Sequence, residues 1–91
     1  MPTYVIEREI LGIGSLPPVE LQGAAQKSNE ALAEIGSKIQ WVESYVTADK
    51  TYCIYIAANE ELVREHARLS GFPANVITLV KAKIDPTTAE G

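Results

Sequence analysis

The stretch WVESYVTADKTYCIYI, from Trp41 to Ile56, decides the fold of this 91-residue chain. Its β-branched and aromatic residues predict two strands, over residues 39–47 and 50–57. The two residues between them, Ala48 and Asp49, suit a hairpin turn. Both faces of this hairpin are apolar, whereas a sheet with one solvated face alternates apolar with polar residues. The hairpin therefore needs a cover on each side.

A two-residue loop fixes the register of the hairpin. It sets Tyr45 opposite Tyr52, Ser44 opposite Cys53, and Glu43 opposite Ile54. One face then carries Trp41, Glu43, Tyr45, Tyr52, Ile54 and Ile56. The other carries Val42, Ser44, Val46, Cys53 and Tyr55. The pattern leaves open which of the two faces meets the rest of the chain.

The remaining segments predict two helices and two more strands. Alternation over residues 3–9 predicts a first strand, and the Pro17–Pro18 pair begins a helix that ends before Gly36. Asn59 is a typical N-cap residue for a second helix, which stops at Gly71. A last strand is predicted over residues 76–84, ahead of a polar tail. The order is βαββαβ.

This order predicts an α+β, ferredoxin-like fold, in which an antiparallel sheet carries both helices on one face. Two helices can cover only one side of the sheet. The other side would be an apolar patch of a size that monomers seldom expose. A homodimer that packs sheet against sheet, as in the dimeric α+β barrels, is the simplest cover.

Length and charge limit the classes of protein to consider. Residues 1–91 support one core, so we expect a single domain with a polar tail over 84–91. A net charge of -4 with scattered Lys and Arg argues against nucleic-acid binding. The single Cys, the absence of a secretion pattern and the absence of a membrane-spanning apolar run predict a cytoplasmic protein. Its expected partners are a second copy of the chain and a metal ion or small molecule.

The only histidine, His66, lies on the apolar stripe of the second predicted helix, so we expect its side chain to face the sheet. With Glu65 beside it and a strand bearing Glu43 or Cys53 in front of it, His66 suits a metal site or an acid–base pair. The alternative is a histidine at the rim of the core, hydrogen-bonded to a backbone carbonyl or a Tyr hydroxyl.

Cys53 and Glu43 each have two interpretations. A Cys53 thiolate would be a metal ligand or a nucleophile, but a lone Cys in a strand also serves as a small buried hydrophobe. A buried Glu43 needs an Arg, a His, a Tyr hydroxyl or a metal as its partner. If its face is the rim of a dimer cleft, Glu43 is solvated instead. No CxxC, HExxH or GxSxG motif occurs.

The segments WVESYVTADKTYCIYIA, EELVREHARLSGFPAN and IDPTTAE, with the opening VIERE, resemble a family of small bacterial ferredoxin-like proteins. This family, formerly of unknown function, has a nickel-binding member in streptomycetes. The resemblance implies a dimer of five-stranded subunits that binds nickel at the dimer surface, for sequestration or detoxification. Members often carry a His where this chain has Glu43, as in WVHSYV. His66, Tyr45, Tyr52 and Cys53 match the family.

Two functions are consistent with these residues. The first is a homodimer without catalytic activity that binds a divalent transition metal, with nickel as the leading candidate, through a set drawn from His66, Glu43, Glu65 and Cys53. The second is an enzyme of the dimeric α+β barrel type, with His66 as acid or base and a substrate held by Tyr45, Tyr52, Trp41 or Glu43. A structural or regulatory interaction domain is a third possibility.

Overall fold

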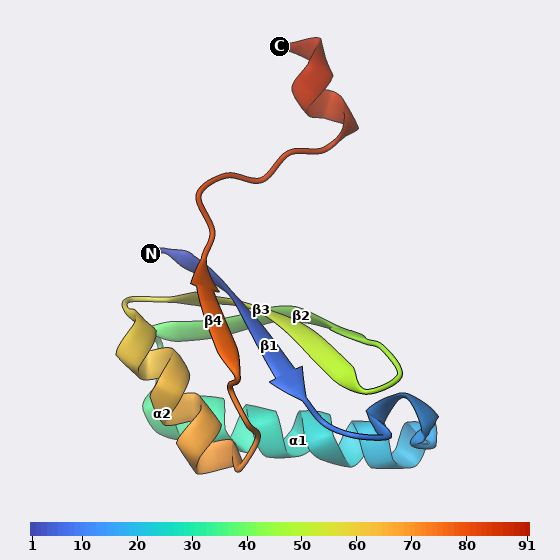
Figure 1. Cartoon of the computed structure of the whole chain (residues 1–91). Coiled ribbons are helices and arrows are strands. Elements are labelled where there is room, and N and C mark those ends of the chain that lie inside the picture. The colour runs from blue at the N-terminus through green and yellow to red at the C-terminus, as the bar shows by residue number, and fades with distance from the viewer.

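The computed structural model describes all 91 residues and has a four-stranded sheet with both helices on one of its faces (Figure 1). The elements are β1 (Thr3–Glu9), α1 (Pro18–Ile35), β2 (Ile39–Val46), β3 (Lys50–Ala57), α2 (Glu60–Ser70) and β4 (Val76–Leu79). The strands lie in the order β2-β3-β1-β4, and all neighbours are antiparallel. The ferredoxin-like α+β fold is confirmed, although the sheet has four strands and not the five that the resemblance implies.

The two helices begin and end at the residues that the sequence predicts. The side chain of Asn59 accepts a hydrogen bond from the Leu62 backbone N–H at 3.1 Å, which caps α2. Gly71 ends α2 in the left-handed conformation, with φ of 78°. Pro18 is the first residue of α1, where its missing N–H costs nothing. Both α1 and α2 lack the length or the apolar composition of a membrane-spanning helix.

The core lies between the helices and one face of the sheet. In β3 the alternate residues Cys53, Tyr55 and Ala57 are buried on this side, together with Ile6 of β1 and Val63 of α2. The residues between them in β3, such as Ile54, point to the other side and are only half-buried. We call the side without helices the open face. The alternation of β3 thus decides which residues meet the helices.

A β-bulge in β2 corrects the predicted division of the hairpin into faces. The predicted pairs of Tyr45 with Tyr52, Ser44 with Cys53 and Glu43 with Ile54 are confirmed. Trp41, however, pairs with Tyr55, so Val42 is an extra residue and the alternation shifts by one. Trp41 therefore packs against the core and donates from Nε1 to the Ser44 hydroxyl at 2.9 Å. The prediction that Trp41 shares a face of the hairpin with Glu43 is therefore wrong. Val42 borders the open face instead.

The last strand is shorter than predicted, because β4 ends at Leu79 and not at Ile84. Leu79 pairs with Tyr4, and the Val80 N–H bonds to the Thr3 carbonyl at 2.9 Å. Since β1 begins at Thr3, the residues after Val80 have no neighbouring strand to pair with. They leave the sheet and end in a short 3-10 helix, Pro86–Glu90, which lies away from the rest of the domain (Figure 1).

The loop after β1 packs tightly on the hairpin turn between β2 and β3. The Gly14 N–H donates to the Ala48 carbonyl at 2.9 Å, and the Gly12 N–H donates to the Asp49 carboxylate at 2.8 Å. A Cβ atom at position 14 would clash with the Thr47 carbonyl oxygen and lie 2.8 Å from the Ala48 Cα. Only glycine fits this approach of two backbones.

We expect Gly14→Ala to lower the free energy of unfolding by about 2 kcal/mol, because the clash is with backbone atoms that cannot turn away. Urea unfolding followed by circular dichroism measures it. Gly23→Ala is the control, since Gly23 lies in α1 with open space around it, and should raise stability by about 0.5–1 kcal/mol. Equal effects of the two substitutions would contradict the packing described.

Candidate functional site

His66 is fully shielded from solvent and faces the sheet, as the sequence predicts. Its Nε2 atom lies 3.0 Å from the hydroxyl of Ser28 on α1 and 3.5 Å from the hydroxyl of Tyr55 on β3. The rings of Tyr55 and His66 have centroids 4.9 Å apart, and the two hydroxyl groups are 3.3 Å apart. Three elements thus bring together one buried polar group of residues, which we call the His–Ser–Tyr cluster.

Burial sets the protonation state of this cluster. Removal from water disfavours the charged imidazolium, and the positive charge of Arg8 acts in the same direction. A hydrogen bond with Ser28 offsets these effects only in part, so the pKa of His66 is lowered to about 4. Burial also raises the pKa of the Tyr55 hydroxyl. At neutral pH the imidazole is therefore uncharged and the phenol keeps its proton.

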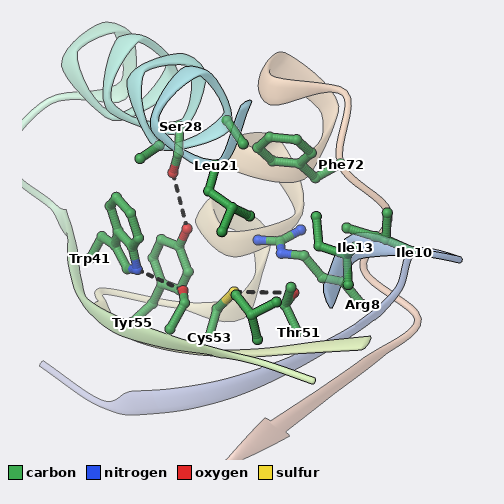
Figure 2. A pocket seen from close by; sticks show the side chains of 14 residues that line it. Arg8, Ile10, Ile13, Leu21, Ser28, Trp41, Thr51, Cys53, Tyr55 and Phe72 are labelled. Atoms are coloured by element: carbon green, nitrogen blue, oxygen red, sulfur yellow. Dashed lines mark hydrogen bonds between the residues drawn. The ribbon is translucent and has the colours of Figure 1, made fainter. Parts of the chain in front are cut away.

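A cavity of about 220 Å³ adjoins the His–Ser–Tyr cluster between the sheet and the helices (Figure 2). Ser28 and Tyr55 belong to its wall, whereas His66 does not line it. Ten of the 14 lining residues are hydrophobic, so the cavity is mainly apolar. The four others are Ser28, Ser44, Thr51 and one charged residue, Arg8 of β1, which is buried and whose guanidinium group is directed into the cavity (Figure 2).

The open face holds three of the residues that the sequence singles out. Glu43 is exposed and accepts a hydrogen bond from the Tyr45 hydroxyl. Tyr52 pairs with Tyr45 across the hairpin and is half-buried. A broad hollow bordered by Glu43, Tyr45, Ile54 and residues 80–84 lies on this face. The sequence left open whether Glu43 is buried with a partner or solvated, and the structure shows that it is solvated.

The other predicted site residues lie apart from Glu43. Cys53 is buried on the helix side, with its sulfur 3.6 Å from the Thr51 hydroxyl, and Trp41 lines the cavity. Glu65 is partly exposed and forms an ion pair with Arg68, whose hydrogen bond lowers the pKa of the carboxyl group. The sheet therefore separates His66 and Cys53 from Glu43, and the chain holds no group of three His, Cys, Asp or Glu side chains that could bind a metal ion.

The helix side does not fit a nickel ion. The Nδ1 atom of His66 is buried without a hydrogen-bond partner, but no carboxylate or thiolate joins it in a ligand group. The charge of Arg8, which lowers the pKa of His66, also opposes a second cation there. Of the residues named for the enzyme hypothesis, Tyr45, Tyr52 and Glu43 lie across the sheet from His66, and Trp41 lines a cavity whose wall does not include His66.

Sequence reasoning missed the role of Arg8. Arg8 stands between Glu7 and Glu9 in the sequence, which indicates no more than a cation that pairs with carboxylates of its own strand. The signal was present in the alternation, because Arg8 follows Tyr4 and Ile6 on the inward side of β1. In the structure the Oε1 atom of Glu7 instead lies 3.8 Å from the Nζ atom of Lys50, on the side of the sheet away from the helices.

The family model of the nickel responsive protein SCO4226-like family matches residues 4–80. This chain belongs to that family. Its structure is similar to the crystal structure of SCO4226 from Streptomyces coelicolor A3(2), with a TM-score of 0.75 and 15% sequence identity. The match covers 90% of this chain and 99% of that one, and at this identity it shows the fold alone. No curated protein matches the chain.

The buried neutral His66 predicts that stability depends on pH. In the unfolded chain the imidazole gains its proton near pH 6.5, whereas in the folded protein it does so only near pH 4. Between these values the unfolded state binds more protons, so acid favours unfolding. We expect the His66 contribution to stability to fall by up to about 3 kcal/mol from pH 7 to pH 4, as measured by urea unfolding.

The variant His66→Gln is the control for this pH dependence, because it removes the titrating group and keeps a side chain that can bond Ser28. The carboxylates of the chain contribute to both profiles, so the difference between the two profiles isolates His66. We expect the wild type to lose more stability than the variant as the pH falls. Parallel profiles between pH 7 and pH 4 would rule out the neutral buried imidazole.

Proposed function

We propose that this protein is a homodimer that binds a divalent transition metal, with nickel first among them, where two open faces meet, and that it sequesters the metal. Membership of the nickel responsive family supports nickel as the metal that is bound. The observation that carries the location is an exposed carboxylate, Glu43, set in an apolar face that no helix covers. The role is binding and not catalysis.

The open face supports the dimer because it is apolar and uncovered. Val42 and Tyr45 expose 47% and 58% of their surfaces, and Ile54 lies half-buried between them and β1. The C-terminal segment extends this surface, since residues 80–84 border the same hollow and Ile84 is 78% exposed. A second copy placed by a twofold axis would cover the sheet and give this segment a surface to pack on.

Glu43 is the metal ligand that we propose on this surface. Its carboxylate is accessible, and the neighbouring Tyr45 hydroxyl holds one of its oxygens by a hydrogen bond. A twofold axis through the joined faces would bring the partner subunit's Glu43 into the same interface. Carboxylates are harder ligands than imidazole, so such a site holds nickel less tightly than a histidine would. The net charge of -4 per chain also favours a cation.

Calorimetric titration of the tag-free protein with nickel chloride tests the site. We expect Glu43→Gln to weaken nickel binding at least about tenfold, because it removes the charged ligand. We expect Glu43→His, which restores the residue that the resemblance indicates at this position, to tighten it by at least about tenfold. His66→Gln should bind nickel like the wild type, because His66 lies across the sheet.

Glu61→Gln is the matched control, because it removes the same charge from the exposed surface of α2. Its nickel affinity should equal that of the wild type. If Glu43→Gln, Glu43→His and the wild type bind nickel equally, the proposed site at the open face is wrong. A loss of binding in His66→Gln alone would place the metal under the helices instead.

A further inference from the structure

Arg8 is a buried cation that the proposed function leaves unexplained. Only 2% of its surface is exposed. Its Nη1 atom donates to the Pro73 carbonyl at 2.7 Å, whereas Nη2 is buried and has no hydrogen-bond partner. A guanidinium group is charged at any physiological pH, and all of its N–H groups are donors. The core therefore holds a positive charge with an unused donor.

No carboxylate forms an ion pair with Arg8. Its guanidinium carbon lies 6.0 Å from the centroid of the Tyr55 ring and 5.9 Å from that of Phe72. Contacts of this kind stabilise a cation only weakly, whereas a buried charge without a counter-charge is strongly unfavourable. The aromatic rings offset only part of this cost. An anion beside Nη2 would supply the missing partner.

The cavity next to Arg8 has room for such an anion together with an apolar body. Figure 2 shows the guanidinium directed towards the middle of the cavity, between Phe72 on one side and Cys53 and Thr51 on the other. The volume of about 220 Å³ corresponds to about seven water molecules. It lies below the roughly 300–1,000 Å³ of sites for drug-sized molecules. The occupant is therefore small.

We propose that this cavity binds a small organic carboxylate. Its anionic head accepts hydrogen bonds from Arg8, and its apolar body lies against walls that include Leu21, Trp41 and Phe72. The wall also carries the hydroxyl-bearing side chains of Ser28, Ser44, Thr51 and Tyr55, which are further polar groups around the cavity. Val46 lines the cavity and is 45% exposed, so the cavity reaches the surface at the end of β2 and offers a route of entry.

The walls select against other ions. Inorganic phosphate has no apolar body to pack on the hydrophobic wall and would lose its hydration on entry, so it should bind weakly. A metal cation is opposed by the charge of Arg8 itself. The carboxylate site and the proposed nickel site lie on opposite sides of the sheet. Each can therefore fail without the other.

Titration of the full-length protein with sodium benzoate and sodium hexanoate, followed by 15N–1H NMR spectra, tests the proposal. Benzyl alcohol serves as a neutral probe of similar shape, and inorganic phosphate serves as an anion without an apolar body. We expect at least one carboxylate to shift the amide signals of residues around Arg8 and Tyr55. It should bind at least about tenfold more tightly than benzyl alcohol or phosphate.

Two substitutions make the test specific. Arg8→Met removes the charge with little change of length, and should abolish the preference for the carboxylate over benzyl alcohol. Ala24→Leu keeps Arg8 but fills part of the cavity, and should abolish binding of both. Arg64→Met, which removes a largely exposed arginine of α2, is the control and should behave like the wild type. Ala24→Leu still decides the matter if Arg8→Met does not fold.

Several results would overturn the proposal. These are the absence of binding of both carboxylates to the wild type, binding no tighter than that of benzyl alcohol, or equal binding of phosphate. Shifts confined to the open face would also overturn it. So would Ala24→Leu binding the carboxylate as tightly as the wild type does.

Discussion

Two helices cover only one face of a four-stranded sheet, and the rest of this structure follows from that constraint. The strict alternation of β3 sends Cys53, Tyr55 and Ala57 under the helices and leaves Ile54 on the open face. One side of the sheet thus becomes a core that contains buried polar groups. The other side remains an apolar surface that holds a solvated carboxylate. The two sides differ in chemistry: one buries the charge of Arg8, and the other exposes Glu43 to solvent in a hollow that Lys81 and Lys83 also border.

The order of the elements and the register of the hairpin were predictable because both depend on local signals. Turn residues, caps and alternation act over a few positions, and the two-residue loop alone fixes the pairing of Glu43 with Ile54. The bulge at Val42 was not predictable, because both faces of the hairpin are apolar and no change of pattern marks the extra residue. The end of β4 depends on where β1 begins, a contact between segments distant in sequence.

The candidate sites were also predictable only where the signal is local in the sequence. The apolar stripe of α2 was enough to predict that His66 faces the sheet, and the structure adds the hydroxyl partners Ser28 and Tyr55. Whether His66 meets Glu43 depends on which face of the hairpin the helices cover, and the sequence pattern does not distinguish the faces. The burial of Arg8 was not predicted, because its sequence neighbours Glu7 and Glu9 are acidic and suggest an exposed ion pair. The alternation of β1 instead turns these neighbours to the other side of the strand. A charge inside a core becomes visible only once the strand is placed between its neighbours.

We propose that a second copy of the chain covers the open face, and sedimentation equilibrium of the tag-free protein at micromolar concentration measures whether the protein is a dimer. We expect a dimer for the wild type and a folded monomer for Ile54→Glu, which places a charge at the middle of the open face. Val19→Glu, which places the same charge on exposed α1, should remain a dimer. A wild-type protein that sediments as a monomer, or an Ile54→Glu variant that remains dimeric, would show that the open face is not a dimer interface.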